Sequence, residues 1–300
     1  MREIVVISGK GGTGKTSLTA AFAHLSENKV LCDLDVDAPD LHILLAPEPL
    51  HREEFYSGNQ AIIDPARCIG CGTCQELCAF EAISSDGEVY AIDPLRCEGC
   101  KVCVTLCPEQ AIDFPPRHCG SWSVSTTRFG PMVHAQLFPG QENSGRLVML
   151  LKQEARRRAE EQGLDLILCD GAPGIGCPVI SSLSGTTLAV LVTEPTPSGR
   201  HDLERVAELC NHFRVQVVVI LNKFELNSDE AARIEAYCSS KGYPLIAKLP
   251  HDNIVTRAMV QRRAVTELPD CTFTEEIKRA WERIEERSRI GKQENSTGSK

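Results

Sequence analysis

Two stretches of this 300-residue chain carry cysteines at a spacing suited to metal chemistry. Residues 64–83 (DPARCIGCGTCQELCAFEAI) and 93–112 (DPLRCEGCKVCVTLCPEQAI) both read C-x2-C-x2-C-x3-C. At this spacing three neighbouring thiolates wrap one [4Fe–4S] cluster, and the fourth cysteine of each run ligates the other cluster. The pattern therefore predicts two clusters, one held by Cys68, Cys71, Cys74 and Cys107, the other by Cys97, Cys100, Cys103 and Cys78.

Zinc is the alternative metal for these eight cysteines, because they could also form two zinc sites of four thiolates each. The repeated triple spacing favours the clusters. One departure is that Ala79 follows Cys78, whereas Pro108 follows Cys107, which loosens one turn without removing a ligand. Among the other cysteines, Cys177 could either pack against its neighbours or bind a metal at a dimer face. Three more are expected in the core: Cys169, Cys210 and Cys238.

A second chemical feature is the glycine-rich segment GKGGTGKT at residues 9–16, which fits G-x-x-x-x-G-K-[ST]. It lies between a predicted strand, EIVVISG, and a predicted helix, KTSLTAAFAHLSE. Backbone amides of such a loop wrap phosphates, and the helix N-terminus favours negative charge. We expect Lys15 to bridge the β- and γ-phosphates and Thr16 to ligate Mg²⁺. The predicted nucleotide-binding loop is Gly9, Gly11, Gly12, Thr13, Gly14, Lys15, Thr16 and Ser17.

Carboxylates follow two other predicted strands. Asp170 ends the apolar run LDLILCD, where nucleotide hydrolases place an aspartate that holds Mg²⁺ through water; a helix-capping turn is the alternative. The loop CDLDVDAP at 32–39 packs three carboxylates together, which is easiest to tolerate near a cation. Asp33 could be a cap, while Asp35 or Asp37 could orient the attacking water, and Asp35 is favoured.

Lys10 before GGTGKT, the D-x-D loop and the segment DGAPG together resemble the MinD/ParA group of ATPases with a deviant Walker A motif. The resemblance spans nearly all of the chain outside the cysteine-rich stretch. It implies that Lys10 reaches across an ATP-sandwich homodimer to the partner's nucleotide; a solvated loop lysine is the alternative. It also implies that Asn222 hydrogen-bonds adenine, with Pro250 and Asp252 beside the base. A guanine-reading NKxD loop is less well matched, because Glu225 is displaced from the aspartate position.

The strand–loop–helix–strand opening predicts an α/β P-loop fold with a mostly parallel sheet, interrupted by a bacterial-type α+β ferredoxin domain. The expected boundaries are 1–60 and 117–288 for the ATPase domain, 61–116 for the insert, and 289–300 for a disordered tail. A β-rich segment (121–138) and a helix (144–163) follow the insert. The last helix, 274–287, carries apolar side chains expected to pack in the core rather than on a membrane: Phe273, Ile277, Trp281 and Ile284.

Composition narrows the protein class. The net charge of −9 disfavours a stable nucleic-acid complex, because such binding depends on Lys and Arg at phosphates. No apolar run approaches the ~18 residues of a membrane span, and the N-terminus lacks a signal-peptide core. We therefore expect a cytoplasmic protein whose fifteen cysteines are reduced rather than paired in disulfides.

Together these features favour an ATP-hydrolysing iron–sulfur protein in which nucleotide-driven dimerisation is coupled to assembly or delivery of a metallocofactor, or to the associated electron transfer. An acceptor or redox partner protein is implied. The alternatives are an ATP-gated electron donor resembling the nitrogenase iron protein, a spatial-positioning switch like ParA or MinD, and a scaffold in which the clusters are structural.

Overall fold

The computed structural model describes residues 1–87, 89–141 and 143–297, and its contacts divide the chain into two compact units. The large unit comprises Met1–Glu53, Trp122–Gln136 and Ser144–Lys300. The small unit comprises Glu54–Ser121 and Leu137–Asn143. No described helix is both long enough and apolar enough to cross a membrane.

A nine-stranded sheet, in the order β13-β12-β11-β1-β10-β2-β9-β8-β3, forms the framework of the large unit. From β13 to β9 every neighbouring pair is parallel, which confirms the predicted mostly parallel α/β fold. The strands are β1 (Arg2–Ser8), β2 (Lys29–Asp33), β3 (Glu48–Asn59), β8 (Pro116–Thr127), β9 (Gly130–Leu137), β10 (Leu166–Pro173), β11 (Leu188–Thr193), β12 (Gln216–Asn222) and β13 (Leu245–Leu249).

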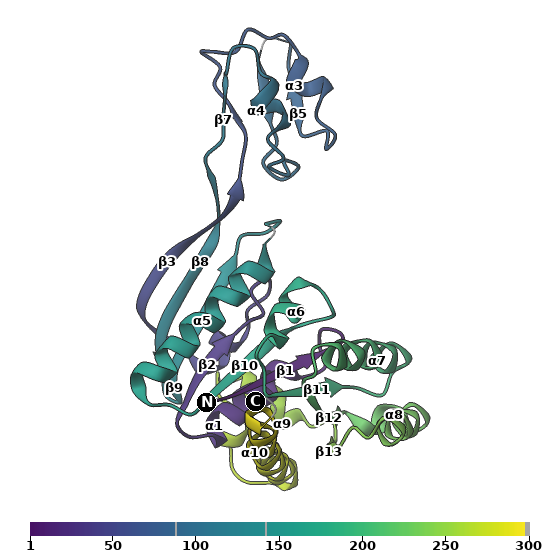
Figure 1. Cartoon of the computed structure of the whole chain (residues 1–300). Coiled ribbons are helices and arrows are strands. Elements are labelled where there is room, and N and C mark those ends of the chain that lie inside the picture. The colour runs from purple at the N-terminus through teal and green to yellow at the C-terminus, as the bar shows by residue number, and fades with distance from the viewer. Residues whose placement is uncertain (88, 142, 298–300) are drawn as a thin grey trace. The chain divides into compact units, whose positions relative to one another are not determined.

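Helices cover both faces of this sheet (Figure 1). One face carries α1 (Lys15–Leu25), α2 (Leu41–Leu45), α9 (Asn253–Val260) and α10 (Thr272–Thr297). The other carries α5 (Ser144–Gln162), α6 (Cys177–Leu183) and α7 (Pro197–His212), and α8 (Ser228–Lys241) packs against α7. Two short 3-10 turns, η1 (Phe224–Leu226) and η2 (Val265–Glu267), complete the described elements of this unit.

The core of the large unit follows from apolar runs in the central strands. All seven residues of β1, REIVVIS, are buried, as expected for a parallel strand covered on both faces. On the α10 side, Phe22 stacks on Trp281 with ring centroids 5.3 Å apart. Phe273, Ile277 and Ile284 join the same cluster, so the apolar side of the last helix packs in the core, as predicted.

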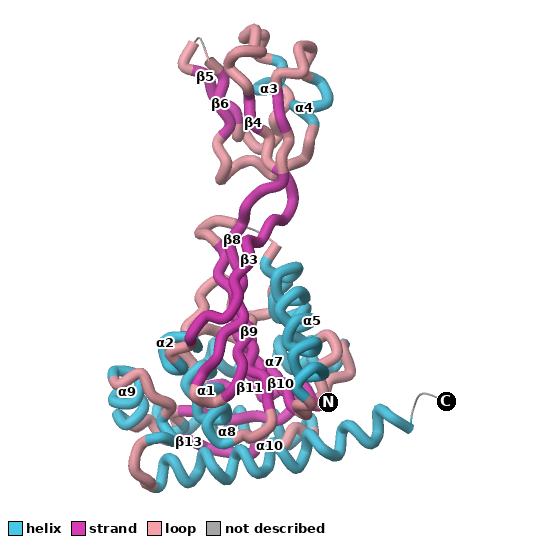
Figure 2. Tube along the Cα trace, turned by 90° about the vertical axis from the view of Figure 1, so that its left-hand side faces the viewer, coloured by secondary structure: helices cyan, strands magenta, loops and turns pink. Residues whose placement is uncertain are grey.

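The C-terminal helix is longer than the sequence suggested. Helix α10, the long helix at the bottom of Figure 2, continues to Thr297, whereas the sequence predicted a disordered tail from residue 289. Residues 298–300 lie outside the described residues. A buried Ser288, whose hydroxyl accepts a hydrogen bond from Arg2 at 3.1 Å, and an i,i+4 pair between Arg289 and Glu285 support the helix beyond residue 287.

The small unit is built from short elements joined by loops (Figure 2). Two antiparallel pairs, β4 (Ile62–Ile63) with β7 (Ile112–Asp113) and β5 (Ile83–Ser85) with β6 (Tyr90–Ile92), accompany α3 (Thr73–Glu76) and α4 (Val102–Leu106). A small apolar cluster holds them together, and six of the eight motif cysteines pack against it or within it.

The small unit extends beyond the stretch 61–116 that the sequence assigned to an insert. It begins at Glu54, ends its first segment at Ser121, and adds Leu137–Asn143, which the sequence assigned to the ATPase domain. Strands β3 and β8 each have residues in both units. The cysteine spacing and the proline boundary therefore predict the cysteine-rich part of the small unit but not the residues of β3 and β8 that belong to it.

Candidate functional site

A cavity of about 560 Å³ opens where the carboxyl ends of the parallel strands meet the glycine-rich loop. Ligand cavities typically measure about 300–1,000 Å³. Most of the residues predicted for a nucleotide line it: Gly11, Gly12, Thr13, Gly14, Lys15, Thr16, Ser17, Asp35, Asn222, Pro250 and Asp252. The lining also includes apolar residues that the sequence did not predict there, among them Val255 and Met259 of α9 and Phe273.

Gly14 has a φ of +94° and directly precedes α1, whose first residue is Lys15. A Cβ at this position would lie 2.5 Å from Asn222 Nδ2, so glycine is required by conformation and by space. Asn222 Nδ2 donates to the Thr13 carbonyl at 2.8 Å, and Asn222 Oδ1 accepts from the Lys223 amide at 3.0 Å. Asn222 therefore holds the loop in shape, and its contact with adenine stays a prediction.

Lys15 lies among carboxylates at the start of α1. Its Nζ is 3.1 Å from Asp170 Oδ1 and 3.4 Å from Asp35 Oδ2. Burial alone would lower the pKa of Lys15, but Asp170, Asp35 and Asp33 outweigh it, so the pKa lies above its ordinary value. Asp170 is fully buried and also accepts hydrogen bonds from the hydroxyls of Thr16, at 2.7 Å, and Thr19, at 2.9 Å.

The three aspartates of the D-x-D loop occupy different environments. Asp33 is fully buried and accepts backbone N–H groups of Asp35, at 3.1 Å, and Leu41, at 3.3 Å, so it serves the loop itself. Burial, followed by the charge of Asp170, raises the pKa of Asp33 well above its usual range. Asp35 and Asp37 both line the cavity, and burial raises the pKa of each.

Lys10 and Gly9 lie beside the cavity rather than in its lining. Lys10 Nζ contacts Glu194 Oε1 at 2.7 Å and donates to the hydroxyls of Thr196 and Ser198. Gly9 allows a close approach to α7, because a Cβ there would lie 2.3 Å from Asp202 Cβ.

Glu194 also contacts Lys223, whose Nζ is 3.0 Å from Glu194 Oε2 and donates to the Gly12 carbonyl at 2.9 Å. A chain of contacts thus joins Lys10, Glu194, Lys223 and the glycine-rich loop. Burial would raise the pKa of Glu194, but its bonds to Lys10 and Lys223 hold that pKa below the usual range. Glu194 and Lys223 were not predicted as site residues from the sequence. They directly follow β11 and β12, and the carboxyl ends of these strands lie at the same sheet edge as the loop, which could have indicated them.

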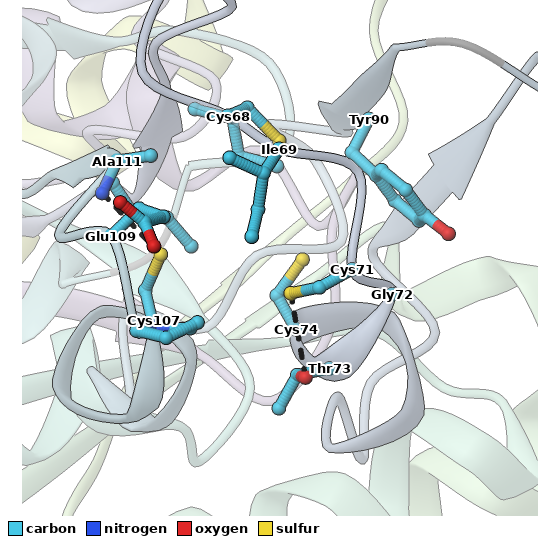
Figure 3. A pocket seen from close by; sticks show the side chains of 13 residues that line it. Cys68, Ile69, Cys71, Gly72, Thr73, Cys74, Tyr90, Cys107, Glu109 and Ala111 are labelled. Atoms are coloured by element: carbon cyan, nitrogen blue, oxygen red, sulfur yellow. Dashed lines mark hydrogen bonds between the residues drawn. The ribbon is translucent and has the colours of Figure 1, made fainter.

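The eight motif cysteines of the small unit divide between two cavities. The first cysteine cavity is lined by Cys68, Cys71, Cys74 and Cys107, whose side chains surround one space in Figure 3. The second cysteine cavity is lined by Cys78, Cys97, Cys100 and Cys103. In each set three thiols come from one repeat and the fourth from the other, so the structure brings together the residues that the spacing had grouped.

Hydrogen bonds reach the sulfurs at both cavities. The backbone amide of Ala111 donates to Cys107 Sγ at 3.3 Å, and that of Ala82 donates to Cys78 Sγ at 3.4 Å. In the first cavity the Cys71 thiol also contacts the Thr73 hydroxyl at 3.5 Å, the dashed line at Thr73 in Figure 3. Amide donors aimed at sulfur suit thiolates, which accept hydrogen bonds and carry negative charge.

All fifteen cysteines lie within the described residues and are free thiols. Cys169, Cys210 and Cys238 are buried, which confirms their assignment to the core, whereas Cys177 is exposed at the first residue of α6. Over residues 1–87, 89–141 and 143–297, no three His, Cys, Asp or Glu side chains converge in a way that could hold a single metal ion.

Comparison with known proteins gives consistent results for most of the chain. Residues 4–265 match the family described as the CobQ/CobB/MinD/ParA nucleotide binding domain. The uncharacterized protein MJ0578 of Methanocaldococcus jannaschii is 36% identical over 230 residues, covering 75% of this chain and 79% of its own length. A second uncharacterized protein of that organism, MJ0579, is 25% identical over 282 residues, covering 81% of this chain and 91% of its own.

Among solved structures, the septum site-determining protein MinD of Pyrococcus horikoshii OT3, complexed with Mg-ADP, has a similar fold. The TM-score is 0.59 at 17% identity, with 97% of this chain and 98% of that chain covered. A likeness at this identity concerns the fold, and it agrees with the expected MinD/ParA-type arrangement of the sheet.

Proposed function

Because the chain belongs to the CobQ/CobB/MinD/ParA family of nucleotide-binding domains, we propose that it is a Mg²⁺-dependent ATPase that carries two [4Fe–4S] clusters. In this proposal nucleotide-driven dimerisation is coupled to the assembly or delivery of an iron–sulfur or related metallocofactor, or to the electron transfer that such assembly needs. A protein acceptor or redox partner completes the system.

The cavity at the glycine-rich loop supports ATP binding with Mg²⁺. The Thr13 hydroxyl is buried in the cavity lining and has no hydrogen-bond partner among the described residues, so a donor remains for a phosphate oxygen. Lys15 can exchange its carboxylate partners for phosphate oxygens. Thr16 and Asp170 already touch through a 2.7 Å hydrogen bond and would hold Mg²⁺ directly and through water, respectively.

Hydrolysis in this proposal needs two subunits. Lys10 sits at the rim of the loop, and its side chain contacts Glu194 rather than the cavity. A cation at the rim is better placed to reach a nucleotide on a facing subunit than the phosphates of its own loop. Supplied in trans, it would stabilise charge on the transferring phosphoryl group, as an arginine finger does. Asp35 in the cavity lining is the residue proposed to orient the attacking water.

The observation that carries the iron–sulfur part is the division of eight cysteines between two four-thiol cavities in the crosswise pattern of two-cluster ferredoxins. A single zinc ion would need four sulfurs at about 2.3 Å from one point. A [4Fe–4S] cluster instead spreads four thiolates over four irons around a larger body, which suits thiols spaced around a cavity. Bound clusters would supply one-electron storage at each cavity.

Anaerobically purified protein tests the combined proposal. Electron paramagnetic resonance should detect two [4Fe–4S] clusters per chain, and their spectra should differ between ATP-bound and nucleotide-free protein. Release of iron or cluster to an apo-acceptor should be faster with ATP than with ADP. Equal transfer rates with both nucleotides would exclude delivery and leave an ATP-gated electron donor, for which reoxidation of the reduced protein by a partner should require ATP.

A spatial-positioning switch is the second candidate, because the family that matches residues 4–265 includes MinD and ParA. ATP-loaded protein should then sediment with DNA or with anionic lipid vesicles at physiological salt, and ADP-loaded protein should not. The net charge of −9 opposes both partners electrostatically, so the metallocofactor proposal is preferred.

A further inference from the structure

The two cysteine cavities are built from matching positions of the repeat, yet they are not chemically equivalent. Thr73 lines the first cavity, and its counterpart 29 residues later is Val102. Tyr90 also lines the first cavity, and its counterpart on the second is Ala61. The lining of the second cavity contains no side-chain hydroxyl among the described residues.

The Thr73 hydroxyl lies on a cluster ligand. Its Oγ1 is 3.5 Å from Cys71 Sγ, and the free thiol, which carries a proton, is the donor of this hydrogen bond. A thiolate bound to iron has no proton and can only accept, so the hydroxyl then becomes the donor. At the corresponding place beside Cys100, the side chain of Val102 has no hydrogen-bond donor.

The phenol of Tyr90 adds a second hydroxyl at the rim of the first cavity. A Cβ placed on Gly72 would lie 3.1 Å from Tyr90 Oη, so the phenol lies close to the turn that carries Cys71. Figure 3 shows Tyr90 and Gly72 on the same side of the cavity as Cys71.

Two backbone hydrogen bonds to sulfur are matched between the cavities. Ala111 to Cys107 and Ala82 to Cys78 are matching backbone bonds of 3.3 and 3.4 Å. They occupy equivalent positions of the two repeats. These two bonds therefore do not distinguish the cavities, whereas the side-chain hydroxyls of Thr73 and Tyr90 occur only in the lining of the first.

Charged side chains act in the opposite direction but more weakly. Glu109 lines the first cavity, whereas Glu98 and Lys101 line the second. All three are exposed, so solvent and salt screen their charges. The Thr73 contact is exposed as well, but it is made directly to a ligand sulfur, whereas none of these three charged side chains has a described hydrogen bond to sulfur.

We propose that the cluster at the first cysteine cavity has the higher reduction potential and that Thr73 is a positioning residue whose hydroxyl stabilises its charge. This inference rests on the proposed function. Donors to thiolate offset the extra negative charge of the reduced cluster, which favours reduction. With both clusters bound, an electron supplied by a low-potential one-electron donor would be held preferentially at the first cavity, where the Thr73 hydroxyl contacts Cys71.

The test is a redox titration of the full chain, reduced stepwise with dithionite and followed by electron paramagnetic resonance. Wild type should show two midpoint potentials. Thr73→Val should lower only the higher one, reducing the ratio of reduced to oxidised cluster at fixed potential by about three- to tenfold, the value of one hydrogen bond; tenfold corresponds to about 59 mV. Val102→Thr should raise only the lower one. Thr105→Val is the matched control, because the Thr105 hydroxyl bonds the Lys101 carbonyl and no sulfur.

Two midpoint potentials that stay unchanged in Thr73→Val, or that both move in the Thr105→Val control, would overturn the inference while leaving the clusters in place. A chain without two [4Fe–4S] signals would instead contradict the proposed function itself. The two failures are thus distinguished by iron content and spectra before any titration is run.

Discussion

Lys10 and Glu194 form an ion pair with Nζ 2.7 Å from Oε1, and Glu194 is shared with Lys223, which bonds the glycine-rich loop. The lysine proposed to serve a partner subunit is therefore held by its own chain when no partner is present. Any role in trans requires it to leave this carboxylate.

Replacing Lys10 should separate ATP binding from ATP hydrolysis. Lys10→Ala should abolish ATP hydrolysis but leave ATP binding to the monomer largely intact, because Lys10 does not line the cavity. Binding is measured by calorimetry and turnover by phosphate release. Lys248→Ala, which removes a surface lysine paired with Glu235, is the control and should change neither. Equal losses of binding and turnover would show that Lys10 acts in its own subunit.

Replacing Glu194 tests whether its ion pair with Lys10 opposes dimerisation. Glu194→Gln removes the competing charge, so the ATP-dependent dimer should form about ten- to a hundredfold more tightly, consistent with about 1.5–3 kcal/mol for a charge-assisted hydrogen bond that no longer has to be broken. Sedimentation with a non-hydrolysed ATP analogue measures this. The same or weaker dimerisation would mean that Lys10 works without leaving Glu194.

Lys15 also has a structural role when the cavity holds no phosphate. Lys15→Met leaves Asp170 and Asp35 without their cation and should lower the free energy of unfolding by about 3–5 kcal/mol. Asp170→Asn in the same chain should restore much of it. The loss should shrink as the pH falls, because carboxylates deprived of a cation take up protons. An unchanged urea midpoint in Lys15→Met would refute the buried network.

The pH dependence of stability should contain a contribution from His134. Burial, followed by the charge of His42, lowers the pKa of His134 to about 4, compared with about 6.5 when unfolded. Between these values the unfolded chain binds a proton that the folded chain does not. Stability is therefore fully present above about pH 6.5 and declines by up to about 3 kcal/mol as the pH falls to about 4.

The matching variant is His134→Gln, whose amide can still meet the Ser125 hydroxyl that lies 2.9 Å from His134 Nε2. Urea unfolding at several pH values should show that wild type loses stability relative to the variant on acidification. A difference between the two proteins that is constant with pH would mean that the pKa of His134 is the same in the folded and unfolded states.

Single cysteine replacements test the crosswise ligand sets. Cys107→Ser should disturb only the cluster at the first cavity, although residue 107 belongs to the second repeat, and Cys78→Ser should disturb only the other. Iron content should fall by about half in each, and the remaining paramagnetic signals should be complementary. Cys119→Ser, which alters a buried thiol of the small unit outside both cavities, should retain both signals.

The elements that the sequence identified are those whose function forces a local pattern. The glycine-rich loop must expose backbone amides, so its glycines and Lys15 are readable in order along the chain. The parallel strands are apolar runs because both faces are covered, as in β1. By contrast β3, a twelve-residue strand of mostly exposed residues, gives no such signal and was not predicted.

The amino-acid sequence by itself determined the loop, the parallel sheet and the grouping of eight cysteines, because each depends on residues at fixed short spacings. Only the tertiary structure decided the partners of Lys10, the bond from Asn222 to Thr13 and the contact between Thr73 and Cys71 within a four-thiol cavity. The first two join residues from distant parts of the chain, brought to one sheet edge by parallel strands. The third is local in sequence, but its meaning comes from Cys107, which folding carries across from the other repeat.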